Sequence, residues 1–235
     1  MKGVVLAGGS GSRMAPMTEV TSKAMVTVYD RPAIEYPLRT LRNMGCEDAV
    51  IVASPTSIGQ IAQYFKQGDR VGMDLEYRVQ GEPKGVADAL KRAQKSVQGV
   101  FPLLLGDVYF GERLRIQTQP TLFWKDYERA NEHSVWNPET DSIVEKPRYI
   151  DLGRRAILAY YYDEQVFDFI DSMSPAQSGE LEIVDIHNFY RQLGAQFIEY
   201  TGFFADMGTP GGLLRAANYE KEKRTCNVVH ANQTN

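Results

Sequence analysis

Cysteine is scarce in this chain of 235 residues, where only Cys46 and Cys226 occur. Two cysteines this far apart do not make a disulfide framework, so we interpret both as reduced thiols. Histidine is scarce as well, and His133, His187 and His230 match neither the spacing of a zinc site nor that of a catalytic triad. The sequence therefore argues against a disulfide-stapled secreted protein and against histidine-based catalysis.

Long apolar runs are also missing, since none approaches the ~20 residues that a membrane-spanning helix needs. Positive charge is not in excess: 26 Lys and Arg against 30 Asp and Glu give a net charge of -4. Such a balance offers no electrostatic footprint for nucleic acid or an anionic membrane. We therefore expect a cytoplasmic globular protein, without a nucleic-acid or membrane partner, that holds any phosphate through a few local groups.

Short apolar, β-branched runs alternate with helical patterns along the chain. Strands are predicted over 3–6, 49–53, 75–79, 100–105, 156–162 and 196–200, and helices over 32–44, 58–65, 85–93, 163–172, 182–193 and 211–223. Continuous rather than alternating hydrophobicity indicates strands covered on both faces, as in a mostly parallel sheet. The pattern predicts an α/β fold with a Rossmann-like sheet flanked by helices. We expect one domain over residues 1–224, followed by a flexible tail over 225–235.

The first predicted strand ends in a glycine-rich loop, "LAGGSGSR", which runs from Leu6 and Ala7 to Arg13. Glycines after a buried strand let backbone N–H groups converge on an anion. Arg13 and, ten residues later, Lys23 are cations suited to phosphate oxygens. Neither known fingerprint is complete, because Met14 stands where a third Rossmann glycine would be and Gly-Lys-Ser/Thr is absent.

The stretch "LAGGSGSRMAPMTEVTSKAMVTVYDRPAIEYPL" resembles the nucleotidyltransferases that join a nucleoside triphosphate to a sugar 1-phosphate. It is most similar to the glucose-1-phosphate thymidylyltransferase type, in a short form without the C-terminal helical extension. The resemblance implies that the nucleotide is held by the loop residues Leu6, Ala7, Gly8, Gly9 and Gly11. Arg13 and Lys23 would then neutralise the triphosphate and the departing pyrophosphate. It also implies a nucleotide half over about 1–110 and an acceptor half over about 111–224.

Three later segments match the same family in the expected order. "RVQGEPKGVADAL" is similar to its base-reading segment, which implies that Gln80 and Gly85 contact the base. "LLLGDVYFG" places Asp107 at the end of a buried strand, a position where open α/β sheets bind ligands and where a carboxylate suits Mg²⁺. "FFADMGTPGGLLRAANY" adds Asp206, which the resemblance makes a second Mg²⁺ ligand facing Asp107. Sequence spacing alone does not show that the two aspartates meet.

The acceptor half keeps some family residues and has lost others. "IVEKP" implies that Glu145 binds sugar hydroxyls and that Lys146 holds the acceptor phosphate. However, Ser178 stands where the family has a phosphate-binding arginine, and Leu158 where it has a glycine close to the sugar. Ser134 likewise replaces a glycine beside the sugar. The nucleotide half therefore matches the family while the acceptor half has changed.

The resulting hypothesis is an Mg²⁺-dependent in-line displacement, in which the acceptor phosphate attacks the α-phosphorus and pyrophosphate leaves. Two alternatives stay open. One is the same chemistry with CTP or GTP on an unusual acceptor, such as a heptose or octose 1-phosphate, a phosphonate or another non-sugar phosphate. The other is a catalytically silent nucleotide-binding regulatory subunit, although intact Arg13, Lys23, Asp107 and Asp206 argue against it. The resemblance is also compatible with a homo-oligomer.

Overall fold

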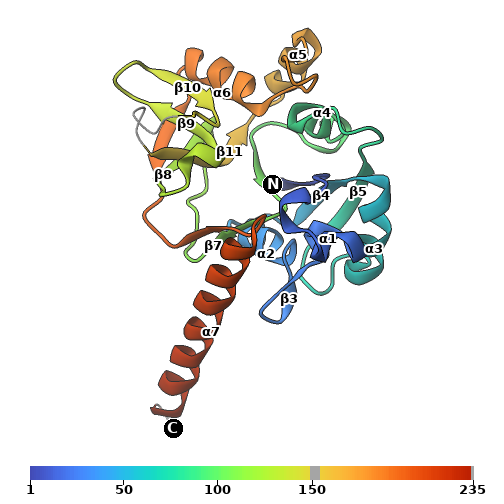
Figure 1. Ribbon diagram of the computed structural model, residues 1–235, viewed down its shortest axis with the longest axis vertical. Helices are drawn as coiled ribbons and strands as arrows, with labels where there is room; N and C mark the ends of the chain where they lie inside the picture. Colours follow the sequence, from blue (N-terminus) through green and yellow to red (C-terminus); the bar gives the residue numbers. More distant parts are fainter. Residues whose placement is uncertain (149–153, 234–235) are drawn as a thin grey trace.

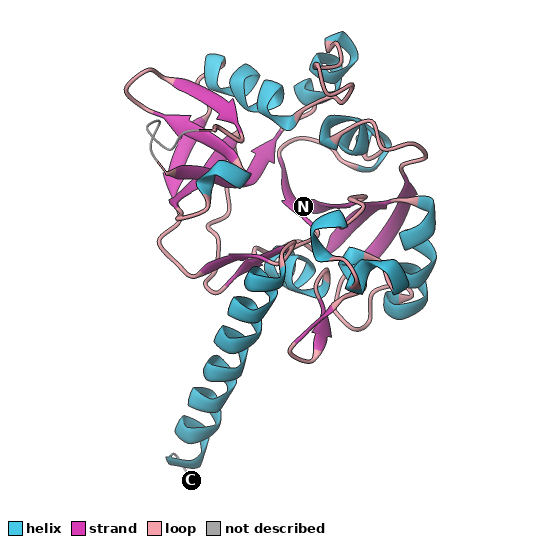
Figure 2. Cartoon of the chain, viewed as in Figure 1, coloured by secondary structure: helices cyan, strands magenta, loops and turns pink. Residues whose placement is uncertain are grey.

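The computed structural model describes residues 1–148 and 154–233 and has a mixed α/β architecture (Figures 1 and 2). Its α-helices are α1 (Met17–Val20), α2 (Glu35–Asn43), α3 (Pro55–Phe65), α4 (Val86–Lys91), α5 (Gln165–Ser172), α6 (Ile183–Gln192) and α7 (Pro210–Gln233). Short 3₁₀ helices are η1 (Ser12–Met14), η2 (Lys23–Met25), η3 (Gln94–Ser96) and η4 (Ala130–Glu132). All six helices predicted from the pattern are present.

A nine-stranded sheet forms the centre of the molecule. From one edge, the strand order is β5 (Asp74–Val79), β4 (Asp48–Ala53), β1 (Lys2–Ala7), β6 (Phe101–Leu105), β11 (Arg155–Tyr162), β9 (Ser134–Asn137) and β10 (Ser142–Glu145). Two further strands branch from this path: β8 (Thr121–Asp126) pairs with β11, and β12 (Gln196–Glu199) pairs with β8. Strands β5, β4, β1 and β6 run parallel, whereas β11 is antiparallel to both β6 and β8. Two small sheets pair β7 (Val108–Phe110) with β13 (Phe204–Asp206) and β2 (Thr27–Val28) with β3 (Arg31–Pro32).

The central strands are covered on both faces, as their continuous hydrophobicity predicted. In β1, Val5 packs into one apolar cluster and Val4 into the cluster on the opposite face. Edge strand β5 is an exception, because its residues are only half-buried or exposed. The chain from Val108 onward is more strand-rich than predicted: β7, β8, β9, β10 and β13 were not expected, because each is short or carries polar residues among its apolar ones.

Helix α7 is longer than the pattern predicted. A helix was expected over 211–223 and a flexible tail after it, but α7 continues to Gln233, so most of the predicted tail is helical. The polar, aperiodic sequence of this last stretch gave no helical signal, because such a stretch has no apolar face to pack. Figure 1 shows α7 projecting away from the sheet. Within the described residues, no helix is both long and apolar enough to cross a membrane.

A buried histidine packs against the apolar cluster that contains Val4, and it predicts acid sensitivity. His187 lies fully buried against the rings of Tyr160 and Tyr162, at centroid distances of 4.8 and 6.4 Å, and neither imidazole nitrogen has a hydrogen-bond partner among the described residues. Burial lowers the pKa of His187 to about 3. In the unfolded chain, His187 is therefore protonated below pH ~6.5, whereas in the folded protein it stays neutral down to about pH 3.

This difference gives the sign of the pH dependence. Stability contributed by neutral His187 is present above pH ~6.5 and is lost as the pH falls toward 3, by about 2 kcal/mol between pH 7 and pH 5. We expect His187→Phe, which keeps the ring and cannot titrate, to flatten this part of the profile. Urea unfolding of both proteins at pH 7 and pH 5 checks the prediction, and an equal fall in both would contradict it.

Candidate active site

The candidate site lies at the carboxyl edge of the parallel strands. The glycine loop follows β1, Ser54 follows β4, Gln80 follows β5 and Asp107 comes two residues after β6. Register brings these ends together, since Ala7 pairs with Ala53 and Leu6 with Leu105. This edge of an open α/β sheet is where such folds bind ligands.

The glycine loop is packed so closely that its sequence is constrained. Gly11 has a φ of 73°, and a β-carbon there would lie 2.7 Å from a carbon of Thr18 and 2.9 Å from the Lys23 side chain. Gly8 approaches Gln80, whose Oε1 would be 2.5 Å from an added β-carbon, whereas Gly9 has open space around it. Thr18 Oγ1 donates to Gly11 O at 2.8 Å and holds the loop against the following segment. A ligand can therefore lie against the bare backbone of Gly9.

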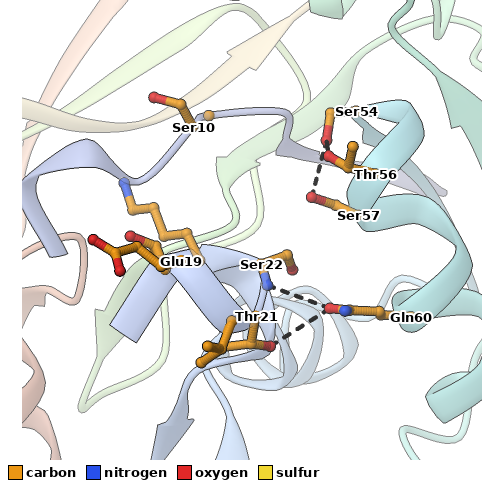
Figure 3. A pocket seen from close by; sticks show the side chains of 12 residues that line it. Ser10, Glu19, Thr21, Ser22, Ser54, Thr56, Ser57 and Gln60 are labelled. Atoms are coloured by element: carbon orange, nitrogen blue, oxygen red, sulfur yellow. Dashed lines mark hydrogen bonds between the residues drawn. The ribbon is translucent and has the colours of Figure 1, made fainter. Parts of the chain in front are cut away.

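A polar cavity of about 240 Å³ adjoins this loop. Figure 3 shows its lining, to which the loop contributes Ser10, the segment before η2 contributes Thr21 and Ser22, and α3 contributes residues of its first turns. Hydroxyl groups and the amide of Gln60 dominate the lining. Ser22 N (3.3 Å) and Thr21 Oγ1 (3.5 Å) both donate to Gln60 Oε1, which links the two walls of the cavity. The cavity is suited to a polar ligand portion beside the loop.

Asp107 and Asp206, which are distant in sequence, lie next to each other at Gly208. Strand β7 pairs with β13, and Met207 N donates to Asp107 O at 2.7 Å, which brings Asp206 beside Asp107. A β-carbon on Gly208 would lie 2.7 Å from Asp107 Oδ2 and 2.8 Å from Asp206 Oδ1. The two carboxylates therefore face each other across Gly208, whose N–H donates to Asp206 Oδ1 at 2.7 Å.

Lys23 joins the same cluster. Its ammonium lies 2.6 Å from the position of a Gly208 β-carbon and forms an ion pair with Asp107 Oδ2, each side chain being 16% exposed. Arg13 lies beside the cluster, with one terminal nitrogen 3.8 Å from Asp206 Oδ2. The structure thus brings together all four residues proposed for phosphate and metal binding.

The electrostatics of the pair differ between the two carboxyls. Burial alone would raise the pKa of Asp107, but the charge and hydrogen bond of Lys23 outweigh it, so this pKa lies below its usual range. Burial raises the pKa of Asp206, and the negative charge of Asp107 raises it further. Like charges held this close need a cation, and here Lys23 supplies part of it.

Gln80 is buried and its orientation is fixed. Its Nε2 donates to Gly85 O at 3.1 Å and to Asp88 Oδ2 at 3.0 Å. Because a carboxylate only accepts hydrogen bonds, the Gln80 amide nitrogen must face Asp88 and its Oε1 must face Gly8. Gly85 has a φ of 101° and packs against Leu181 O, which a β-carbon would approach to 2.4 Å. The segment therefore presents one hydrogen-bond acceptor toward the loop.

The residues predicted to bind the acceptor do not form one cluster as the four charged residues do. Glu145 ends β10, accepts a hydrogen bond from Ser134 Oγ at 2.5 Å and pairs with Lys146 Nζ at 3.1 Å. Ser178 lies in an exposed turn and donates to Glu182 Oε1 at 2.9 Å. Leu158 is only 1% exposed within the core, so it can shape a pocket only through packing.

A family model described as "Nucleotidyl transferase" matches residues 2–223 of this chain. The chain belongs to the nucleotidyl transferase family. It is therefore an enzyme that transfers a nucleotidyl group, and the mixed α/β fold with its Rossmann-like sheet agrees with this membership.

Curated relatives of this nucleotidyl transferase align over nearly its whole length. A glucose-1-phosphate thymidylyltransferase of Xanthomonas campestris pv. campestris (strain B100) is 32% identical, over 93% of this chain and 80% of the relative. One of Neisseria meningitidis is 28% identical, over 98% of this chain and 86% of the relative.

Solved structures agree with these relatives. A Bacillus anthracis protein, solved with sucrose and assigned as a glucose-1-phosphate thymidylyltransferase, superimposes with a TM-score of 0.86 at 30% identity, covering 93% of this chain and 94% of that one. A UDP-glucose pyrophosphorylase solved with UDP-glucose reaches a TM-score of 0.81 at 20% identity, over 94% and 98% of the two chains, and supports the fold alone.

Sequence reasoning missed three charged residues of this nucleotidyl transferase. Asp88 fixes the Gln80 amide, and an acidic residue among the apolar residues of "VADAL" was the available signal. Glu132 and Arg129 lie beside Arg13, but in "YERANEH" their alternating charges are typical of a solvated surface. His133, to which no role was given, is neutral in this setting because burial lowers its pKa to about 4.

Proposed function

We propose that this nucleotidyl transferase joins a pyrimidine nucleoside triphosphate, thymidine or uridine, to a sugar 1-phosphate, giving a nucleoside diphosphate sugar and pyrophosphate. The observation that carries the proposal is the convergence of Lys23, Asp107 and Asp206 on Gly208 beside the glycine loop. The thymidylyltransferase relatives act in the same reaction class, and their names give the acceptor class proposed here. Both substrates are phosphorylated metabolites of the cell interior, so we place the enzyme in the cytoplasm.

In the proposed reaction, an anionic oxygen of the acceptor phosphate attacks the α-phosphorus of the triphosphate. A new P–O bond forms, the bond from the α-phosphorus to the bridging oxygen breaks, and pyrophosphate takes the electron pair. Arg13 and Lys23 hold the triphosphate and stabilise the charge that develops on the leaving group. No covalent enzyme intermediate is needed, because the acceptor is already a nucleophile.

The residues at Gly208 fit a magnesium ion. Two carboxylates face each other there, and burial together with their mutual repulsion raises the pKa of Asp206, a conflict that a divalent cation relieves. Among the residues that the structure describes, no group of three or more His, Cys, Asp and Glu is arranged to hold a metal. Two carboxylates completed by substrate phosphates are the usual protein share of a Mg²⁺ site. We propose that Asp107 and Asp206 hold Mg²⁺, which when bound supplies charge neutralisation on the phosphates.

The preference for thymine or uracil comes from Gln80. Its Oε1, facing Gly8, accepts a hydrogen bond, and thymine and uracil offer an N3–H donor at their Watson–Crick edge. Cytosine carries an acceptor at N3, so the same contact is lost. CTP is therefore the less favoured pyrimidine nucleotide. GTP stays an alternative, because guanine also carries an N–H donor, although its base is larger.

Replacing Asp88 with asparagine tests this base selection. The amide that takes the place of the carboxylate can donate or accept, so Gln80 is no longer held with its oxygen toward Gly8, and we expect the preference for TTP or UTP over CTP to fall about tenfold. Arg92→Gln is the matched control, because it removes the 2.8 Å partner of Asp88 and leaves the carboxylate in place. Ratios of kcat/KM across the three triphosphates give the result, and an unchanged ratio in Asp88→Asn would refute this role for Gln80.

The residues of the proposed acceptor half are compatible with a sugar phosphate that is bound through fewer charged contacts than in the family. Lys146 remains available as a cation for the acceptor phosphate, whereas Ser178 brings no charge to it. Ser134 donates to Glu145, so one carboxylate oxygen already has a partner before a sugar hydroxyl arrives. Pyrophosphate release that requires triphosphate, Mg²⁺ and a sugar 1-phosphate together tests the proposal. Triphosphate binding without release under any pairing would favour the silent regulatory subunit.

A further inference from the structure

Arg13 already faces an anion in this structure. One terminal nitrogen of its half-exposed guanidinium donates to Glu132 Oε2 at 3.1 Å. Glu132 belongs to η4 in the acceptor half, 119 residues further along the chain. The cation proposed to hold the triphosphate is therefore paired with a carboxylate from the opposite side of the site.

The other oxygen of the same carboxylate binds a second arginine. Arg129 donates to Glu132 Oε1 through Nε at 3.0 Å and also through Nη2, and its Nη1 donates to Thr209 Oγ1 at 3.3 Å. Thr209 follows the turn of Asp206 and Gly208 and lies just before α7. Arg129 is thus anchored next to the proposed metal site and shares one anion with Arg13.

A carboxylate between two guanidinium groups has the character of an oxyanion site. The planar fork of arginine binds carboxylate and phosphate with the same bidentate geometry. A terminal phosphate group carries more negative charge than a carboxylate, so it is the stronger partner for two cations at this distance. A purely structural role is weakly supported, because ion pairs with side chains as exposed as Arg13 and Arg129 contribute little to stability.

We propose that Arg129 is a second arginine of the pyrophosphate subsite and that Glu132 is its resident counter-anion, displaced when the β- and γ-phosphates bind. This inference rests on the proposed function, since it extends the triphosphate site to a residue of the acceptor half. The β- and γ-phosphates are the groups involved, because Arg13, which shares Glu132 with Arg129, follows the glycine loop and is proposed to hold the departing pyrophosphate. Glu132 then sets how tightly the site holds both the incoming triphosphate and the departing pyrophosphate.

Calorimetric titration with inorganic pyrophosphate in MgCl₂ tests the proposal directly and does not depend on the unidentified acceptor. Glu132→Gln removes the competing charge, and we expect pyrophosphate to bind about fivefold more tightly. Arg129→Gln in the Glu132→Gln background removes a guanidinium that contacts phosphate, and we expect binding about tenfold weaker than in Glu132→Gln alone. Glu128→Gln is the matched control, because Glu128 pairs with Arg215 at 2.8 Å, and it should leave the affinity unchanged.

The double variant separates a direct role of Arg129 from one exerted through Glu132. If Arg129 acted only by holding Glu132, removing it in the Glu132→Gln background would change nothing, and the proposal would be wrong. Weaker binding in Glu132→Gln alone would show that Glu132 positions Arg13 and would equally overturn it. Steady-state kinetics locate the phosphate: the KM for the triphosphate should move with pyrophosphate affinity, whereas a change confined to the KM for the sugar 1-phosphate would contradict the assignment. Failure of the proposed function itself is distinguishable, because the wild-type protein would then release no pyrophosphate with any pairing of substrates, whatever the variants do to pyrophosphate affinity.

Discussion

Asp107→Asn is expected to lower kcat by about 100- to 1,000-fold while the protein remains folded. Asp107 pairs with Lys23 and faces Asp206 across Gly208, so its charge acts on both of these residues at the proposed metal site. Folding should survive because Asn keeps the shape of the side chain, and the bond from Met207 N to the carbonyl of residue 107 does not involve the carboxyl. Initial rates of pyrophosphate release and a thermal melt give the two readouts.

The titration of Asp206 provides a second readout in the same variant. Burial is the main reason that the pKa of Asp206 is raised, and the charge of Asp107 is the next. Removing that charge should lower the pKa of Asp206 without returning it to its ordinary value, which carboxyl ¹³C shifts followed against pH would show. Asp126→Asn, which removes an exposed strand-end aspartate paired with Arg154 at 3.0 Å, is the control and should keep full activity. Near-normal turnover in Asp107→Asn would remove this residue from the metal site.

Lys23→Gln is expected to lower kcat about 100-fold and to make the protein respond more strongly to Mg²⁺. The ammonium of Lys23 pairs with Asp107 and meets Asp206 at Gly208, so we expect it to neutralise the triphosphate in the reaction and the aspartates before substrate arrives. Without it, Asp107 and Asp206 repel each other more strongly, and a divalent cation that binds only the folded state stabilises the protein by more. Thermal melts with and without MgCl₂ measure this second effect.

Lys2→Gln is the matched control, because Lys2 forms an ion pair with Glu76 at 3.2 Å at the opposite end of β1. It should leave both turnover and the Mg²⁺-induced rise in Tm unchanged. A Lys23→Gln protein whose Tm rises no more with Mg²⁺ than the wild type would show that the ammonium and the metal do not share a site.

The first half of the chain could be predicted well because its signals are local. The strand of Val4 and Val5 is buried on both faces and ends at glycines, and the helices end near glycines such as Gly45, features that follow from the properties of a few adjacent residues. The short added strands of the second half could not be predicted in the same way. Strands such as β9, with "SVWN", carry polar residues on a half-covered face, and their pairing with β10 and β11 depends on contacts distant in sequence.

The site shows the same division. Arg13, Lys23 and Asp107 could be proposed as candidates from loops that follow buried strands, and the resemblance added Asp206. The meeting of Asp107 with Asp206 required the pairing of β7 with β13, which no local pattern indicates. The bridge from Arg13 through Glu132 to Arg129 was invisible in the sequence, because charged residues in a short polar segment look alike whether they face solvent or a ligand. The roles of Glu145, Lys146, Ser178 and Leu158 in acceptor binding remain predictions.

Pyrophosphate release by the wild-type protein, measured with Mg²⁺ across all pairings of TTP, UTP, CTP, GTP and ATP with a panel of sugar 1-phosphates and phosphonates, tests the proposed reaction most directly. We expect release only when both substrates are present, fastest with TTP or UTP and a sugar 1-phosphate, and abolished by EDTA. The product should carry the nucleotide on the acceptor phosphate, as mass spectrometry would show. Binding of triphosphate with no release in any pairing, or release that needs no acceptor, would contradict the assignment of this protein as a sugar-1-phosphate nucleotidyltransferase.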